Sequence, residues 1–399
     1  MTFNIDPVRV VWPPEATTSL PQDTYRATLV GRVHRPGFGP SVVFYDDGNL
    51  FDVTHAFPTM SALVEVDNPV QTVREVHSEY IGTFTDIFSQ TCRSDAETAT
   101  LLSPVDLQAV KAAGVTFAAS MMERLIEERA AGDPEAAAAL RHDLHELIGG
   151  SLRELVPGST SANQVKDSLK RRGLWSQYLE VGIGKDAEIF TKAQPLSTVG
   201  TGMQIGVLAD SKWNNPEPEI GLVLSSKGTP VGATLANDVN LRDYEGRSAL
   251  LLPKAKDNNA SAALGPFIRL FDDDYSLTDV CESEVTLSVT GPDEFVLQDT
   301  SSQSESSRDP LDLVEQLMGP HHQYPDGVVL MLGTMFAPTK DRSEHDQGFT
   351  HYRGDVVQIA NDRLGTLVNV VEESERIRPW TYGVRNLMKD LSKRGVLHS

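Results

Sequence analysis

The feature that most constrains this chain is a pair of glutamates in a short polar segment. Residues 213–219 read Trp-Asn-Asn-Pro-Glu-Pro-Glu, so Glu217 and Glu219 stand one residue apart. Alternate side chains of an extended segment share a face. The two carboxylates can therefore point the same way.

A predicted β-hairpin follows this pair. The apolar run 220–224 predicts a strand, residues 228–230 predict a turn, and 231–235 predict the returning strand, which leads to Asp238. A third carboxylate is thereby expected to return towards the two glutamates.

Three converging carboxylates indicate a particular kind of cation. Oxygen ligands with no nearby cysteine or histidine favour Mg²⁺, with Mn²⁺ or Ca²⁺ as substitutes, over zinc. An acidic, solvent-exposed hairpin that binds no metal is the alternative, and the spacing alone does not decide between them.

Length and charge limit the class of protein. The 399 residues suffice for one large core and a smaller domain, and 40% hydrophobic with 23% charged residues is ordinary for a soluble protein. A formal net charge of −21 argues against binding to nucleic acid or to an anionic membrane. An anionic substrate remains possible, because a cation and a few lysines can reverse the local field.

Cysteine usage and the amino terminus suggest a compartment. Cys92 and Cys281 are far apart and in no metal or redox spacing. The first residues carry neither a basic flank nor a long apolar run, and no stretch reaches membrane-spanning length. We therefore expect a cytoplasmic protein.

The expected fold class is α+β and rich in β-structure, in two parts. Residues 1–103 predict a smaller β-rich domain, and residues 104–399 predict a metal-binding catalytic domain with a helical insertion at about 121–179. Individual strands are expected at 27–33, 41–45, 50–53, 328–332, 356–359 and 367–371, helices at 123–130, 134–148, 310–318 and 382–394, and a serine-rich polar loop at 300–308.

Three further motifs each allow a functional and a structural interpretation. Residues 182–187, Gly-Ile-Gly-Lys-Asp-Ala, fit a dinucleotide fingerprint by letters, but they lack a clear preceding strand and following helix and predict a turn. The pair His321-His322 lies between prolines and predicts an exposed loop rather than a metal site. Lys256, close after Asp238, could orient an oxyanion or act as a base, or could be an ordinary exposed lysine.

Together these residues resemble the fumarylacetoacetate hydrolase superfamily, in order from Pro104 to about Val371. The matching motifs are Glu217-x-Glu219, Asp238 in an Asn-Asp-Val run, Arg242-Asp243, Lys256 before Leu264-Gly265-Pro266, Phe190-Thr191-Lys192, Gly333-Thr334, Gly354-Asp355 and the Gly-Thr-Leu-Val-Asn run at 365–369. The resemblance implies a mixed β-roll core and a metal held by Glu217, Glu219 and Asp238.

One departure from the family pattern bears on the reaction. Hydrolases of this family carry Gly-x-Asn-Tyr-x-x-His-x-x-Glu where this chain has Gly114 to Glu123, so Ser120 stands at the histidine position and Glu123 keeps the acidic one. Serine has no useful basicity near neutral pH. Histidine-assisted hydrolysis of a carbon–carbon bond is therefore in doubt.

The sequences of residues 113–117 and 184–190 resemble those of the sugar-acid dehydratase branch of this family, and so does the long insertion at about 121–179. That resemblance implies Mg²⁺-dependent dehydration of a 2-keto-3-deoxy-pentonate, in the D-xylonate or D-arabinonate form, to 2-oxoglutarate semialdehyde in oxidative pentose catabolism. It assigns proton transfer to Glu123, with Ser120 placing a water and Lys256 as the alternative base. Lys192, Thr334 and Arg242 are the expected substrate-binding residues.

Two other functions are compatible with the same residues. One is a hydrolase or decarboxylase of acylpyruvate-like substrates, and the other is a catalytically silent ligand-binding relative. The family resemblance also implies a homodimer or homotetramer.

Overall fold

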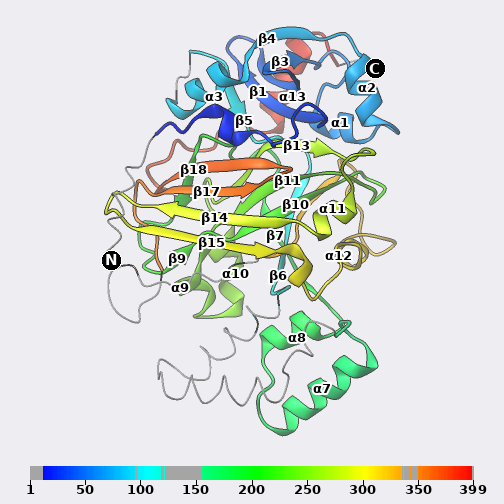
Figure 1. Ribbon diagram of the computed structural model, residues 1–399, viewed down its shortest axis with the longest axis vertical. Coiled ribbons are helices and arrows are strands. Elements are labelled where there is room, and N and C mark those ends of the chain that lie inside the picture. Colours follow the sequence, from blue (N-terminus) through cyan, green and yellow to red (C-terminus); the bar gives the residue numbers. More distant parts are fainter. Residues whose placement is uncertain are drawn as a thin grey trace, which may run out of the picture.

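The computed structural model describes residues 12–94, 97–117, 121, 155–334, 336, 342 and 349–397. Two β-sheets pack face to face and dominate this part of the chain (Figure 1). None of the helices in these ranges combines the length and the apolar character needed to cross a membrane.

The larger sheet has eleven strands in the order β4-β3-β2-β1-β13-β11-β10-β16-β6-β7, with β5 paired to β1. All pairs are antiparallel except β16 with β6. The strands are β1 (Leu29–Arg35), β2 (Gly39–Asp46), β3 (Asn49–Asp52), β4 (Glu79–Thr83), β5 (Thr100–Leu102), β6 (Ala109–Gly114), β7 (Glu188–Ala193), β10 (Pro218–Leu224), β11 (Pro230–Asp238), β13 (Ala262–Leu270) and β16 (Val328–Met331).

The smaller sheet has five strands in the order β15-β14-β17-β18-β8. These are β8 (Gln204–Val207), β14 (Glu284–Thr290), β15 (Val296–Ser302), β17 (Val356–Asn361) and β18 (Gly365–Glu373), and a short pair joins β9 (Asn214–Asn215) to β12 (Asn240–Leu241). The β18–β8 pair is parallel, so both large sheets are mixed.

The central strands β10 and β13 are buried along their whole length. On β10, Ile220, Leu222 and Leu224 join the core between the two sheets, whereas Val223 packs into a second core on the opposite face. Strands covered on both faces read as continuous apolar runs. This explains the uninterrupted run at 220–224.

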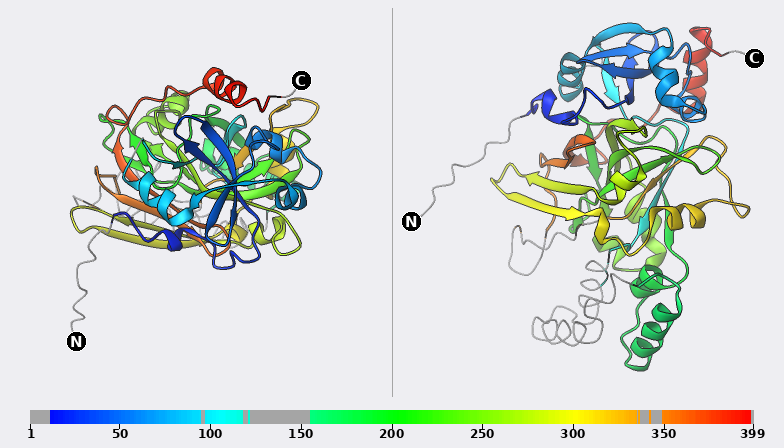
Figure 2. Two further views of the ribbon diagram at one scale, coloured as in Figure 1. Left: turned by 90° about the horizontal axis from the view of Figure 1, so that it is seen from above. Right: turned by 45° about the vertical axis from the view of Figure 1, so that its right-hand side comes forward.

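Helices cover the two ends of the molecule. Near the amino-terminal strands lie α1 (Met60–Val64), α2 (Pro69–Glu75), α3 (Phe84–Cys92) and α13 (Val384–Lys393), and at the opposite end α7 (Thr160–Arg171) and α8 (Gln177–Ile183) project away from the sheets (Figures 1 and 2). Between them lie α9 (Arg242–Glu245), α10 (Leu252–Lys256), α11 (Leu277–Cys281) and α12 (Pro310–Leu317).

The amino-terminal strands share a sheet with the rest of the chain. Leu29 and Val30 of β1 pair with Arg269 and Ile268 of β13. At the other end of the sequence, Arg394 after α13 donates to Pro40 O at 3.2 Å and to Ser41 Oγ at 2.9 Å. The boundary at residue 103 therefore stays a prediction.

Most of the predicted elements that fall on described residues are confirmed within a few positions. The loop predicted at 300–308 is wrong in its first part, because β15 runs to Ser302 and a 3₁₀ turn follows. The outer edge of β15 carries no partner strand among the described residues, so polar side chains suit it. The helices expected at 123–130 and 134–148, and most of the insertion, lie outside the described residues.

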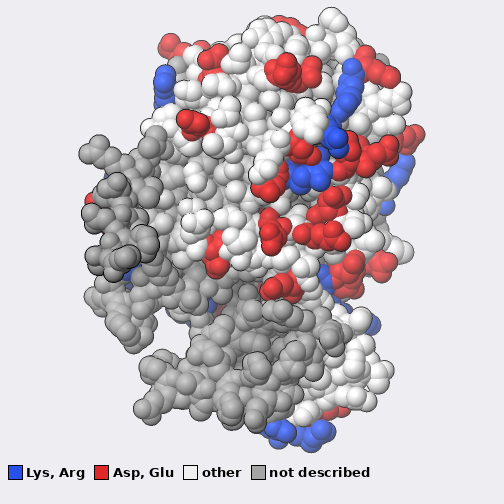
Figure 3. Space-filling view, viewed as in Figure 1, with Lys and Arg blue, Asp and Glu red and all other residues white. Residues whose placement is uncertain are grey.

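Acidic side chains outnumber basic ones on the face shown in Figure 3, in line with the net charge of −21. The large buried cations are nevertheless paired. Arg269 of β13 is fully buried, and its two terminal nitrogens donate to the two Asp23 oxygens at 2.6 and 2.8 Å.

We predict that Asp23→Ala lowers the free energy of unfolding by about 3 kcal/mol, because it leaves a buried guanidinium without its carboxylate. Chemical denaturation measures this loss. The control is Glu372→Ala, whose partner Arg353 is half exposed, and it should cost only about 0–1 kcal/mol. Equal losses in the two variants would contradict the prediction.

Candidate metal centre

The β10–β11 hairpin brings the three predicted carboxylates together. Pro218 pairs with Asn237 and Glu219 with Ala236 in the strand register. The Asp238 N–H donates to Glu217 O at 2.9 Å, which extends this pairing by one residue. The acidic residues therefore meet at the end of the hairpin where β11 finishes.

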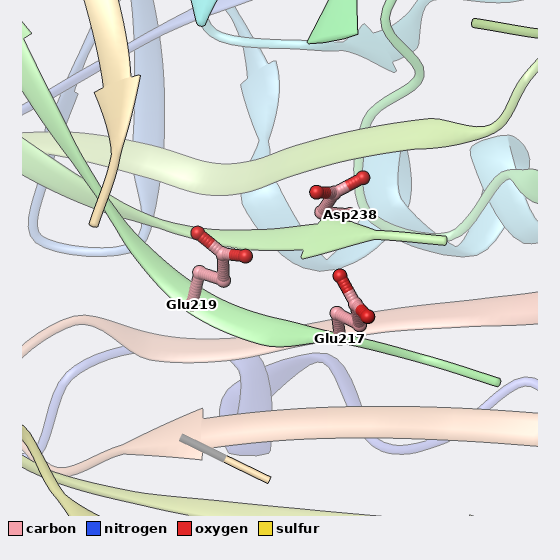
Figure 4. Close-up of side chains that lie close together, drawn as sticks. All are labelled: Glu217, Glu219 and Asp238. Carbon is pink, nitrogen blue, oxygen red and sulfur yellow. The ribbon is translucent and has the colours of Figure 1, made fainter. Parts of the chain in front are cut away.

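The three side chains converge and are removed from solvent. One oxygen from each of Glu217, Glu219 and Asp238 lies within 4.8 Å of the others (Figure 4). Their exposed fractions are 4%, 1% and 1%. The alternative of an acidic, solvent-exposed hairpin is thus excluded.

Two lysines lie against the carboxylates. Lys256, at the end of α10, forms an ion pair with Glu217 Oε2 and donates to Asp238 Oδ2 at 3.0 Å. Lys192 of β7 lies 2.7 Å from Asp238 Oδ1 and also donates to Val239 O at 2.8 Å. Asp238 is therefore fixed from two sides.

Neutral donors fix the two glutamates. The Gly333 N–H donates to Glu219 Oε2 at 2.7 Å, and Asn240 Nδ2 donates to Glu217 Oε1 at 3.0 Å. Gly333 has φ of +99°, and a Cβ there would lie 1.9 Å from Thr116 Oγ1. Only glycine satisfies both the backbone conformation and the space at this position.

The charges in this cluster shift its pKa values in opposite directions. Burial, and then the negative charges of Asp238 and Glu217, raise the pKa of Glu219 well above its ordinary value. Burial by itself would lower the pKa of Lys256, but the Asp238 and Glu217 carboxylates outweigh it and raise that pKa. Burial lowers the pKa of Lys192. Three carboxylates facing two ammonium groups leave negative charge that a cation would balance.

The donor set fits Mg²⁺. All three converging groups are carboxylates, and the part of the chain that the structure describes brings no cysteine or histidine into the cluster. Hard divalent cations prefer such oxygen ligands. Glu217, Glu219 and Asp238 would hold the ion.

A small cleft opens beside the cluster, with an empty volume of about 290 Å³ that includes space open to solvent. Charged and polar side chains make up much of the cleft lining, which suits a polar ligand. Its polar lining comes from Glu188, Glu217, Asp238, Glu245, Lys256 and Thr334.

Of the three predicted substrate-binding residues, the structure places one on the cleft wall and two elsewhere. Thr334 lines the cleft, whereas Lys192 is fully buried beside Asp238 and supports that carboxylate. Arg242 begins α9, with its guanidinium over the Trp213 ring at 4.6 Å, and it is not among the lining residues. Ser120 and Glu123 lie outside the described residues.

Sequence reasoning missed two acidic residues of the cleft, Glu188 and Glu245. Glu188 is the first residue of β7, and alternate residues of that strand lead through Phe190 to Lys192. Glu188 precedes Lys192 by four residues, which is two periods of the strand, and this spacing is the signal that could have identified it.

Residues 182–187 and the pair His321-His322 lie at the ends of elements or in loops, and the turn predicted at 182–187 begins only after Ile183, the last residue of α8. Residues 182–187 follow from helix α8 into strand β7, the reverse of the strand-to-helix order that a dinucleotide fingerprint needs. His321 and His322 are exposed, with His321 Nε2 3.1 Å from Gln316 O.

Parts of this chain are similar in sequence to a known family and to two known enzymes. Residues 181–372 match the family model described as fumarylacetoacetate (FAA) hydrolase C-terminal. A probable 2-keto-3-deoxyxylonate dehydratase of Haloferax volcanii is 35% identical over 194 residues, 49% of this chain and 63% of that protein. A 2-dehydro-3-deoxy-D-arabinonate dehydratase of Saccharolobus solfataricus is 32% identical over 193 residues, 48% of this chain and 60% of that protein.

The chain therefore spans about three fifths of the length of these relatives. Among solved structures, the apo form of a 2-keto-3-deoxy-D-arabinonate dehydratase superposes with a TM-score of 0.61 at 23% identity, covering 87% of this chain and 99% of the other. A structure of such a dehydratase with magnesium and 2,5-dioxopentanoate has the same TM-score at 22% identity and the same coverage. The fold is shared with these proteins.

We predict that Glu219→Gln weakens Mg²⁺ binding by at least about 100-fold, because even outer partners of a metal ligand contribute about 10–100-fold. The matched control is Glu315→Gln, an exposed carboxylate of α12 that does not line the cleft, which should change affinity less than about fivefold. Isothermal titration calorimetry measures both. Equal losses would mean that the triad is not the ligand set.

Mg²⁺ affinity should rise with pH through the raised pKa of Glu219, because the carboxyl must lose its proton to bind the cation. When EDTA keeps the site free of metal, folding stability should fall with rising pH, opposite to the Mg²⁺ affinity. A raised carboxyl pKa adds stability at pH values below the ordinary glutamate pKa, about 4.3, and this stability is lost as pH rises through the raised value. In thermal melts with EDTA, the melting temperature of Glu219→Gln should fall less with rising pH than that of the unaltered protein.

Proposed function

We propose that this chain, whose residues 181–372 match the fumarylacetoacetate (FAA) hydrolase C-terminal family model, is a Mg²⁺-dependent hydro-lyase. Its substrate is a 2-keto-3-deoxy-pentonate in the D-xylonate or D-arabinonate form, and its product is 2-oxoglutarate semialdehyde. The observation that carries the proposal is the buried all-oxygen triad beside Lys256 in a small cleft. The names of the two matching relatives support the reaction class.

The reaction removes one water molecule from one substrate molecule. A proton leaves carbon 3, the carbon 4 hydroxyl leaves with a proton as water, and the resulting unsaturated ketone tautomerises to the semialdehyde, also called 2,5-dioxopentanoate. A cation at the triad would polarise the 2-oxo group and acidify the carbon 3 protons. The chain itself must hold the anionic substrate and move the protons.

Lys256 serves substrate binding better than proton removal. The residue lines the cleft, and the neighbouring carboxylates raise the pKa of its ammonium group, so it stays charged at neutral pH. A charged ammonium attracts the substrate carboxylate but cannot accept a proton. Lys192 keeps Asp238 in place from the buried side.

Two carboxylates are candidates for the proton transfers. Glu123, with Ser120 placing a water, follows from the family resemblance. Glu188 follows from its position in the cleft wall. An elimination needs both removal of a proton and protonation of the leaving hydroxyl, so the two residues can share the work.

The decisive assay incubates the Mg²⁺-loaded protein with 2-keto-3-deoxy-D-xylonate and, separately, with its L-arabinonate counterpart. We expect one five-carbon semialdehyde by nuclear magnetic resonance, faster from the D-xylonate form, and loss of turnover with EDTA or Glu217→Gln. Two fragments would indicate a hydrolase or decarboxylase. Binding without turnover would indicate a silent relative, and full activity without metal would refute the mechanism.

We predict that Glu188→Gln and Glu123→Gln each lower kcat by about 10²–10⁴-fold, the usual contribution of a general acid or base. The control is Glu315→Gln on the exposed side of α12, which should retain full activity. Steady-state kinetics measures all three. Unchanged kcat in either cleft variant would remove that residue from the mechanism.

The assembly and compartment remain predictions. A homodimer or homotetramer is proposed, and light scattering of the purified protein would test it. A cytoplasmic location is proposed on the composition alone.

A further inference from the structure

The segment Ser306-Ser307-Arg308, which follows the 3₁₀ turn after β15, lies between two distant parts of the chain. We propose that Ser307 and Arg308 are positioning residues, which hold residues 114–117 and 181–184 together so that the cleft wall carrying Glu188 keeps its place. Only the activity readout of this proposal rests on the proposed function.

Ser307 fixes the first of these two parts. Its N–H donates to Thr116 O at 2.7 Å, and its hydroxyl lies 2.8 Å from the same carbonyl oxygen. Ser306 forms an isolated β-bridge with Phe117. Residues 114 and 115, directly before Thr116, line the cleft.

The same two side chains fix the second part. The Ser307 hydroxyl is also 3.2 Å from Gly182 O. Arg308 Nη2 donates to Val181 O at 2.7 Å and to Gly184 O at 2.9 Å. The last carbonyls of a helix lack intrahelical donors, and a cation there is favoured by the helix dipole. Arg308 therefore caps the end of α8.

Met121, four residues beyond the first part, contacts the second part. A Cβ at Gly182 would lie 1.7 Å from Met121 Sδ, so the fully buried Met121 packs against this glycine. Thr116 Oγ1 in turn donates to Leu332 O at 2.9 Å. Ser307 and Arg308, here called the clamp, thus act on a segment that contacts Leu332, and the next residue, Gly333, donates to the metal-site glutamate Glu219.

A second set of contacts links Arg308 to Glu188. Arg308 Nη1 donates to Asp312 at 3.1 Å, Asp312 accepts from Gln316 at 3.1 Å, and Gln316 Oε1 accepts from the Ala187 N–H at 2.6 Å. Ala187 directly precedes Glu188. Helix α12 and Arg308 together determine where β7 begins.

The burial of Arg308 argues that this arrangement is specific. The residue is 2% exposed, and Asp312, the carboxylate it pairs with, has a side chain that is 43% exposed. Most of its N–H groups donate to backbone carbonyls of residues more than a hundred positions away in the sequence. A planar guanidinium fork can reach several carbonyls at once, which an apolar side chain cannot do.

The test compares Arg308→Met with Arg308→Lys in the full-length protein. Arg308→Met should lower kcat by about 100-fold, as expected for a misplacement of about 1 Å, with KM changed less than about threefold. Mn²⁺ binding should keep its stoichiometry and its affinity within about twofold, because the triad is held by other contacts. Arg308→Lys should restore part of kcat.

Ser307→Ala offers a milder variant in case Arg308→Met does not fold. It removes one hydroxyl and should lower kcat about tenfold, while Ser304→Ala, at an exposed serine of the preceding 3₁₀ turn, should leave kcat unchanged. Hydrogen exchange of amides 181–184 should quicken in Ser307→Ala and in Arg308→Met but not in Ser304→Ala.

The outcomes separate this proposal from the proposed function. Wild-type kcat together with wild-type exchange in both clamp variants would overturn the clamp, as would joint loss of Mn²⁺ binding and turnover in Ser307→Ala, which would show a merely structural role. If the unaltered protein dehydrates no 2-keto-3-deoxy-pentonate, the proposed function fails. Amide exchange then decides the clamp alone.

Discussion

The arrangement of the site depends on an unequal number of buried charges. Glu217, Glu219 and Asp238 face two ammonium groups, those of Lys192 and Lys256, in a place almost closed to water. Burial of unbalanced charge is costly. The raised pKa of Glu219 is one response to this imbalance, and a divalent cation would be another. Ion pairs and hydrogen bonds hold the three carboxylates close to one another.

The fold supplies that constraint from several directions. The hairpin register places Glu217 opposite Asp238, β7 contributes Lys192, α10 contributes Lys256, and the segment after β16 contributes the Gly333 N–H. These elements are far apart in sequence, so only the packed sheets bring them together. Because β10 and β13 are buried on both faces, the position of the triad follows from the same apolar runs that form the core.

The sequence predicted the triad, Lys256 and most of the strands, because period-two patterns and ordered motifs are local signals. It did not predict that Lys192 would lie behind Asp238, that Arg242 would stack on Trp213, or that Glu188 would face the cleft. Those facts depend on strand order and on which neighbour covers each side chain. The serine-rich stretch before Arg308 predicts a loop, because the polar residues of an edge strand have the composition of a loop. It contacts residues 116 and 182, which are more than a hundred positions away in the sequence, so no local pattern could predict these contacts.

The most direct test of the metal centre is anomalous diffraction from crystals soaked in Mn²⁺, which takes the ligands that Mg²⁺ takes. The account predicts one strong peak within coordination distance of Glu217, Glu219 and Asp238, and no peak there in Glu219→Gln crystals. A peak elsewhere, with none at the triad in crystals of the unaltered protein, would contradict the central claim that these three buried carboxylates form a metal site.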